Sequence, residues 1–297
     1  MAIFNNHIFF PTDFSDNAEQ ALTFAAEIAY QTGAKLTLFH AKRDPINFSP
    51  SAEPSRKNTS KAIEAKFEEL LITLKNNKRY QNLTISTILQ AGQPAPTLLN
   101  QISENQPGLV VMGRQGATAS RSTIMGSVTT SIIQKSEVPV LAVPSNSTLD
   151  GFKKILFTTD YQNGDLAALT QTVAFARLFD ATIDVLHVAE YNNLENDIKF
   201  RGFRELVTEH FEYDKITFHL LLEHDFFPGV VEYVSEHPTS LMVLVRYQKS
   251  FWERLAQRNH SKEMAFHSTM PLLILTGHKK DSERIIVENT QKAQDAG

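Results

Sequence analysis

The feature that most constrains the fold of this chain is an internal duplication. The stretch HIFFPTD at residues 7–13 returns as KILFTTD at 154–160, and the triplet FHA at 39–41 returns as LHV at 186–188. The aspartate and the histidine of these segments stand 27 positions apart in both copies, so the register holds without a gap. A third pair of segments ends the copies: VPVLAV at 138–143 and MPLLIL at 270–275. A pattern of about 145 residues written twice predicts two domains rather than a solenoid.

Each copy alternates apolar runs with segments of helical periodicity. We expect a loop at residues 43–58, which are rich in Pro, Ser and Asn. Alternating strands and helices with mostly apolar strands predict the α/β class, as two tandem domains with doubly wound parallel sheets. In the first copy the expected strands are 7–11, 35–40, 83–89, 109–112 and 138–143, and the expected helices are 18–30, 63–74, 94–103 and 127–135.

A polar stretch at 144–150 separates the copies. We expect a first domain at 1–146, a second at 151–278 and a polar C-terminal tail at 279–297. A chain of 297 residues is long for one domain and comfortable for two.

The composition excludes several classes of function. Without cysteine the chain has no disulfide, thiolate metal site or Cys nucleophile, which suits a reducing compartment. A net charge of -4 and the lack of a basic run argue against nucleic acid as a partner. With no run of 18 apolar residues and no evident signal peptide, we expect a cytoplasmic protein without a membrane span.

A glycine-rich loop is the strongest chemical motif. Gly113 and Gly116 follow the apolar run 109–112, and Gly126 and Ser127 stand at the start of the helix expected at 127–135. Glycine lets main-chain amides approach an anion, and a helix N-terminus offers unpaired N–H groups, so the arrangement predicts a phosphate site. The pattern Gly-x2-Gly-x9-Gly-Ser is neither a Walker A loop nor a dinucleotide fingerprint.

Asp13 follows the first expected strand, at the carboxyl edge of the sheet. In open α/β sheets ligands bind at this edge, at the switch point where the strand order reverses. A carboxylate there can accept from a ribose hydroxyl or a base amine. The competing interpretation is helix capping, but Asp16, with Glu19 three positions later, is the better candidate for the cap.

These motifs together resemble the universal stress protein family, in its tandem two-domain form: PTDFS at 11–15, LFHA at 38–41 and the glycine pattern before VPVLAV. The resemblance covers about residues 5 to 277. It implies a five-stranded, Rossmann-like sheet of the adenine nucleotide α-hydrolase-like type, and ATP or AMP binding where the loop is intact. By resemblance the site residues are Pro11, Thr12, Asp13, Ala41, Met112, Gly113, Arg114, Gly116, Gly126, Ser127, Val128 and Thr129.

The resemblance also assigns these residues to parts of the nucleotide. Asp13 and the main chain of Ala41 would face the adenosine, and Met112 with Gly113 the ribose; Gly116 and residues 126–129 would surround the phosphates. Arg114 and Arg121 are candidates for neutralising phosphate charge, with a solvated surface side chain as the equal alternative. The final strands of the two domains, 138–143 and 270–275, would associate across a pseudo-twofold axis.

The second copy lacks the loop. On the gap-free offset of the final strands, Gly113 meets Val245, Gly116 meets Gln248, and the pair Gly126-Ser127 meets Arg258 and Asn259. The bulky stretch 247–254 contains no glycine and would fill space that a triphosphate needs. We therefore expect one nucleotide site per chain, in the first domain, and a structural role for Asp160.

Taken together, the sequence predicts regulation of a stress response through ATP, ADP or AMP, with Mg²⁺ held by phosphate oxygens as a candidate companion ion. No catalytic residue and no protein metal site is expected, so any ATP hydrolysis would be slow. The alternatives are a slow ATP hydrolase and an interaction module with an empty pocket. A homodimer is a further candidate assembly.

Two weaker candidates lie in the second copy. His219 and His224, near acidic neighbours, could form a metal site, but core or surface histidines explain them as well. Phe251 and Trp252, with Phe226 and Phe227, could offer an apolar patch, for which domain packing is the simpler explanation.

Overall fold

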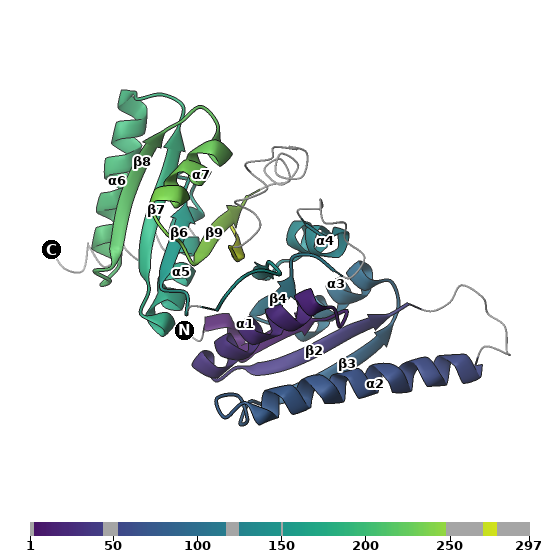
Figure 1. Cartoon of the computed structure of the whole chain (residues 1–297). Coiled ribbons are helices and arrows are strands. Elements are labelled where there is room, and N and C mark those ends of the chain that lie inside the picture. Colours follow the sequence, from purple (N-terminus) through teal and green to yellow (C-terminus); the bar gives the residue numbers. More distant parts are fainter. Residues whose placement is uncertain (1–2, 44–52, 117–124, 150, 248–269, 278–297) are drawn as a thin grey trace. The chain divides into compact units, whose positions relative to one another are not determined.

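The computed structural model describes residues 3–43, 53–116, 125–149, 151–247 and 270–277 (Figure 1). The chain divides into two compact units, Met1–Ser147 and Thr148–Gly297. Each unit is described by itself below. The domain bounds expected from the sequence stay predictions, and the tail at 279–297 lies outside the described residues.

The first unit alternates strands with helices around one parallel sheet. Along the chain lie η1 (Ile3–Asn6), β1 (His7–Pro11), α1 (Asp16–Thr32), β2 (Lys35–Lys42), α2 (Glu53–Asn76), β3 (Ile85–Ala91), α3 (Pro94–Asn105), β4 (Leu109–Gly113), α4 (Ser127–Lys135) and β5 (Val140–Val143). The strands of this unit follow the order β3-β2-β1-β4-β5, and each neighbouring pair is parallel.

The second unit repeats this order with its own strands. Along the chain lie β6 (Lys154–Thr158), α5 (Asp165–Phe179), β7 (Thr182–Ala189), α6 (Leu194–His210), β8 (Ile216–Leu222), α7 (Phe226–Glu236), β9 (Leu241–Arg246) and β10 (Leu272–Thr276). The order is β8-β7-β6-β9-β10, and all four pairs are parallel. The expected α/β class with doubly wound parallel sheets is confirmed.

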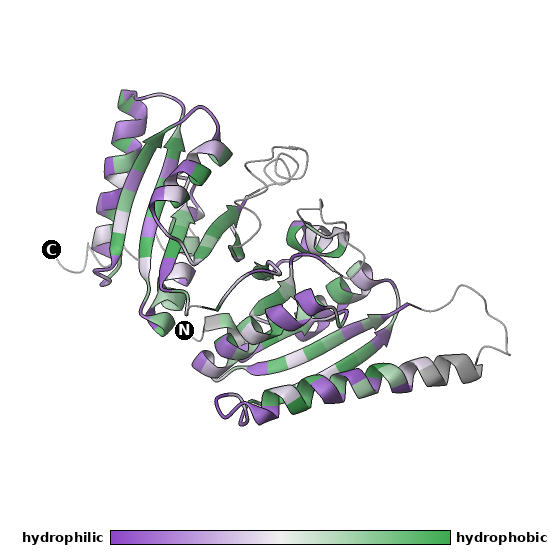
Figure 2. Cartoon of the chain, in the orientation of Figure 1, coloured by the Kyte–Doolittle hydropathy of each residue, from purple (hydrophilic) through white to green (hydrophobic). Residues whose placement is uncertain are grey.

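The inner strands of both sheets are buried because they are mostly apolar, whereas the edge strands β3 and β8 are only partly buried. In β1, Ile8, Phe9 and Phe10 have no exposed surface, and β6 buries Leu156 and Phe157 to the same degree. Figure 2 shows mainly hydrophobic residues along the strands and a mixture of hydrophobic and hydrophilic residues on the helices. A parallel sheet covered on both faces requires this pattern, since neither face meets water.

Two local expectations are wrong. The stretch 43–58 was expected to be a loop, yet α2 begins at Glu53, and the apolar face that continues it buries Phe67 and Leu70. The N-cap of α1 is Ser15, whose side chain accepts from the main-chain N–H of Ala18, whereas Asp16 is the first residue inside the helix. A serine oxygen reaches the free N–H groups of the first turn as well as a carboxylate does.

The strand order creates one switch point in each unit. In the first unit the chain passes from β1 to β2 on one side and later places β4 on the other side of β1. In the second unit β6 stands between β7 and β9 in the same way. The carboxyl ends of β1 and β4, and of β6 and β9, are therefore the places where ligands bind in sheets of this kind. No helix in the described part of the chain is both long and apolar enough to cross a membrane.

Candidate functional site

The fold brings the predicted site residues to one edge of the first sheet. Pro11 ends β1 and is followed by Thr12 and Asp13, and Ala41 lies near the end of the neighbouring strand β2. On the other side of β1, strand β4 ends with Met112 and Gly113 and leads to Arg114 and Gly116. Helix α4 contributes its N-cap and first turn: Gly126, Ser127, Val128 and Thr129.

Asp13 and Gly116 meet across the switch point. A Cβ atom added to Gly116 would lie 2.7 Å from Oδ2 of Asp13, so a side chain here would push the carboxylate out of its present position. The other carboxylate oxygen, Oδ1, accepts from the Ser15 N–H at 3.1 Å and from its hydroxyl at 2.6 Å. Asp13 is exposed and does not cap α1; it orients the serine that does.

The two ends of the glycine loop are tied to each other. The N–H of Gly126 donates to the carbonyl of Arg114 at 2.8 Å, and the Thr129 hydroxyl donates to the carbonyl of Gly113 at 3.0 Å. A Cβ on Gly126 would lie 3.5 Å from the nitrogen of Gly116, so the two glycines are close neighbours. The residues between these ends, 117–124 with Arg121, lie outside the described part.

Helix α4 begins at the loop with an uncapped N-terminus. Its N-cap is Gly126, in an extended conformation, and no side chain caps the first turn of this nine-residue helix within the described structure. The first N–H groups of a helix have no intrahelical partner and carry a partial positive charge. This end of α4 is therefore suited to an anion.

Arg114 adds a buried positive charge to the loop. Its side chain is 4% exposed, and its Nε and Nη1 atoms have no hydrogen-bond partner among the described residues. Burial lowers the pKa of Arg114 to about 10, so the group is still charged at neutral pH. The alternative of a solvated surface side chain is wrong for Arg114. A buried guanidinium without a counter-charge is unfavourable, and an anion would relieve it.

Three predicted site residues present no side chain to a ligand. Thr12 is 7% exposed, Met112 5% and Thr129 3%. The hydroxyl of Thr12 accepts from the N–H of Phe14, and the hydroxyl of Thr129 donates to the carbonyl of Gly113. Both hydroxyls are thus used inside the protein, and Met112 has no polar group to offer, whereas Arg114 is equally buried but has two nitrogens without a partner among the described residues.

The turn that carries Asp13 is held by residues whose role the sequence reasoning missed. Phe14 has a left-handed φ of 59°, and its ring lies 4.8 Å from that of His40 and 5.2 Å from that of Phe67. Nδ1 of His40 lies 2.7 Å from the carbonyl of Thr12 and must donate, because a carbonyl only accepts. The repeated spacing between Asp13 and His40 was the signal for this contact.

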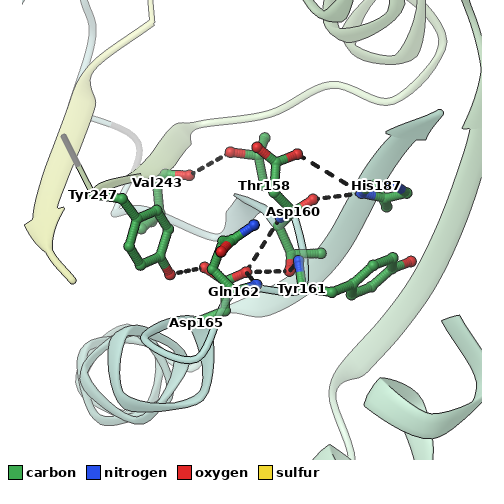
Figure 3. A network of polar contacts seen from close by, with 9 residues as sticks. Thr158, Asp160, Tyr161, Gln162, Asp165, His187, Val243 and Tyr247 are labelled. Carbon is green, nitrogen blue, oxygen red and sulfur yellow. Dashed lines mark hydrogen bonds and ion pairs between the residues drawn. The ribbon is translucent and has the colours of Figure 1, made fainter. Parts of the chain in front are cut away.

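The second unit builds the same turn, as Figure 3 shows around Asp160. Nδ1 of His187 donates to the carbonyl of Thr159 at 2.7 Å, and Tyr161 has a φ of 56° with its ring 4.2 Å from that of His187. The turn is therefore common to both copies, including the one without a glycine loop. Val245 takes the place of Gly113 inside β9, whereas Gln248, Arg258 and Asn259 lie outside the described residues.

The weaker candidates are not assembled into a site. His219 lies 3.9 Å from Oδ1 of Asp184, whereas His224 pairs with Glu190 at 2.8 Å. Within the described ranges, no group of three or more His, Asp or Glu side chains could hold a metal ion. Phe227 is buried, with 7% of its surface exposed, and the patch residues Phe251 and Trp252 lie outside the described residues.

The first unit is similar in sequence to known proteins. Residues 5–144 match the model of the universal stress protein family. The chain is 28% identical over 145 residues to a universal stress protein of Bacillus subtilis. This match covers 46% of this chain and 98% of that protein. It is 24% identical over 157 residues to one of Methanocaldococcus jannaschii, over 48% and 97% of the two chains.

A solved structure extends the likeness in fold to both units. A universal stress protein from Archaeoglobus fulgidus has a TM-score of 0.73 at 15% identity, covering 93% of this chain and 100% of that one. At this identity the match shows the Rossmann-like α/β fold alone. The family match rests on the first unit. Residues 5–144, the first unit, belong to the universal stress protein family, and the second unit repeats their fold.

Proposed function

We propose that the first unit binds ATP, or its relatives ADP and AMP, at the switch point between β1 and β4. Mg²⁺ bound through the phosphate oxygens is a candidate companion ion. The observation that carries this proposal is the meeting of Asp13 with Gly116, because it sets a glycine loop against a carboxylate where open α/β sheets bind ligands.

The chemistry of each part suits a different part of the nucleotide. The exposed Asp13 carboxylate can accept from a hydroxyl or an amine of the adenosine. The glycines and the uncapped first turn of α4 offer N–H groups to the phosphates. Arg114, immediately after β4, brings a guanidinium with two nitrogens that have no partner among the described residues. This division assigns the adenosine to the β1 side and the phosphates to the β4 side.

We propose a single site per chain. Val245 stands in β9 where Gly113 ends β4, and the sequence from 247 to 254 contains no glycine. A side chain at these positions withholds the main-chain amides that a phosphate needs. Asp160 and its turn persist in the second unit, which is consistent with a structural role for that turn.

The mechanism we propose is regulation rather than catalysis. A nucleotide that binds one conformation better shifts the population by its differential affinity alone. The conformational readout would pass through the association of residues 138–143 with 270–275, or through a homodimer. A cysteine-free chain suits the reducing cytoplasm, where we place the protein.

A slow ATP hydrolase is the competing function. Phosphoryl transfer to water needs a residue that positions the attacking water, and no residue of the sequence stands out as that base. We expect turnover below about 1 s⁻¹, the low end for ordinary enzymes. Single-turnover assays with labelled ATP measure this directly, and a faster rate would assign the protein to the hydrolases.

Isothermal titration of the full chain, stripped of co-purified ligand, tests the binding proposal. We expect one ATP per chain in the presence of Mg²⁺. Asp13→Ala should weaken binding about tenfold or more, because it removes a charged hydrogen-bond acceptor. Asp16→Ala is the matched control, since this exposed carboxylate three positions away lies inside α1 and should leave the affinity unchanged.

Each other outcome has a definite meaning. Absence of heat and of any thermal shift with ATP, ADP or AMP would favour an interaction module with an empty pocket. Two equivalent sites per chain would refute the single-site assignment. Equal losses in the Asp13 and Asp16 variants would indicate a general charge effect and would remove Asp13 from the site.

A further inference from the structure

Tyr247 occupies the switch point of the second unit. It follows β9 directly, and its hydroxyl donates a hydrogen bond to Oδ1 of Asp165, the first residue of α5 (Figure 3). Asp165 has no exposed surface. The contact therefore joins the carboxyl end of β9 to the helix that follows β6, across the place where the strand order reverses.

Two glycines make room for the tyrosine ring. A Cβ added to Gly164 would lie 2.7 Å from Cε1 of Tyr247, and one added to Gly277 would lie 2.3 Å from the same atom. Neither glycine has a left-handed φ, so the backbone alone does not require glycine at either position. At Gly277 the ring requires it, and at Gly164 the ring does so together with the Cα of Gly277, which would lie 3.1 Å from the added atom. The ring packs between the start of α5 and the chain after β10.

Asp165 is surrounded by donors in the manner of a bound anion. Its Oδ2 accepts from the Thr159 hydroxyl at 2.7 Å, from the Gln162 N–H at 2.9 Å and from the Asp160 N–H at 3.2 Å. With the Tyr247 hydroxyl on Oδ1, both oxygens are satisfied. Burial raises the pKa of this carboxyl, while the hydrogen bonds from Tyr247 and Thr159 act in the opposite direction. The carboxylate is thus held inside the protein by its own chain.

The first unit has a different contact at the same place. On the duplication offsets, Asn17 corresponds to Gly164, Ala18 to Asp165 and Gln115 to Tyr247. In the first unit the Asn17 amide donates to the carbonyl of Gln115 at 3.4 Å. Relative to the first unit, the second has a glycine (Gly164) in place of Asn17 and a tyrosine (Tyr247) in place of Gln115. The loss of one side chain and the gain of a larger one compensate each other in volume.

We propose that Tyr247 is an internal ligand, a phenol side chain that fills the switch point of the second unit and uses the Asp165 carboxylate as its acceptor. The second unit then keeps a fixed, closed switch point without a bound nucleotide. When the Tyr247 ring is removed, the space that it leaves should accept an aromatic hydroxyl compound. The inference rests on the second unit alone and stands whether or not the first unit binds ATP.

Chemical rescue tests the proposal directly. Tyr247→Ala should leave a space for p-cresol, and an apolar cavity of similar size in a protein binds aromatic molecules. We expect p-cresol to raise the unfolding midpoint of Tyr247→Ala saturably and to leave the wild-type midpoint unchanged. Toluene should bind about tenfold more weakly, because it has no hydroxyl to donate to the carboxylate. Absence of a saturable rise, or equal binding of the two compounds, would overturn the proposal.

A double-mutant cycle gives a second test that needs no added ligand. Gly164→Ala in the wild type should raise the unfolding equilibrium constant about tenfold or more, since the ring must move. In the Tyr247→Ala background the same change should have a clearly smaller effect, because only the contact of 3.1 Å between the added atom and the Cα of Gly277 is left. Gly202→Ala in α6 is the control, because nothing lies within 4 Å of the added atom. An equal effect of Gly164→Ala in both backgrounds would refute the packing argument.

Further measurements separate this inference from the nucleotide proposal and cover a variant that does not fold. If Tyr247→Ala does not fold, Tyr247→Leu replaces it in the cycle, and the same coupling is expected. Gly164→Ala should leave the ATP affinity and stoichiometry of the first unit unchanged. A change in either would link Tyr247 to the first site and contradict an internal ligand confined to the second unit.

Discussion

Replacing Arg114 should raise the stability of the nucleotide-free protein and lower its affinity for ATP. Burial lowers the pKa of its guanidinium from 12.5 to about 10, which corresponds to about 3 kcal/mol against the charged form in the folded protein. Two of its nitrogens have no partner in the described structure to offset this. Methionine has a similar length and no charge. We therefore expect Arg114→Met to raise the free energy of unfolding of the nucleotide-free protein by about 1–3 kcal/mol.

The same substitution should weaken nucleotide binding. It removes the donors that a phosphate would use, so the ATP affinity should fall about tenfold or more, and the AMP affinity by less. Urea denaturation at pH 7 without nucleotide measures the first effect, and isothermal titration measures the second. Arg201→Met is the control: its side chain is exposed and pairs only with Asp197 one turn away, so both quantities should stay near wild type.

The reasoning would be refuted by a less stable nucleotide-free variant with unchanged ATP affinity. That pair of results would mean that Arg114 already satisfies its charge within the protein and packs as a structural residue. A stabilised variant with unchanged affinity would confirm the unpaired charge but place it away from the phosphates. Only higher stability together with weaker binding supports the assignment.

Three further predictions concern single positions. Gly116→Ala should leave the free energy of unfolding within about 0.5 kcal/mol, because the added methyl displaces only the exposed end of Asp13, yet ATP binding in a titration should drop sharply. Burial opposes the charge of Glu27, but hydrogen bonds, led by that from Arg79, hold its pKa below 4.5. The pair thus stabilises the fold above that pH and loses this contribution as pH falls through the lower folded pKa. Arg79→Met should flatten this part of a stability–pH profile and lower the stability at pH 7. Gly108→Ala should cost about 3 kcal/mol or more in urea denaturation, since its Cβ would lie 1.7 Å from the main chain of η1, and a near-neutral result would contradict that packing.

The duplication and the glycine pattern were readable from the sequence because each depends on local repetition. Apolar runs with helical segments between them predict parallel strands wherever they fold, and the spacing from Asp13 to His40 returns unchanged in the second copy. The loop at 43–58 and the cap at Asp16 were predicted wrongly. Ser and Asn disfavour a helix only weakly, and Pro54 lies in the first turn of α2, where its missing N–H has no intrahelical partner to lose. Burial of the apolar face with Phe67 and Leu70 then stabilises the helix.

The sequence by itself determined the fold class, the repeat and the loop that distinguishes its halves, since all three reside in the order of residue types along the chain. Only the tertiary structure decided which residues come into contact. Gly116 leaves room for Asp13, Arg114 is buried with two nitrogens that lack a partner in the described part of the chain, and Tyr247 contacts Asp165 at the switch point of the second unit. These pairs lie about 80 to 100 residues apart in the chain, or depend on burial. Their contacts follow from how strands β1 and β4, or β6 and β9, come side by side, which no local pattern encodes.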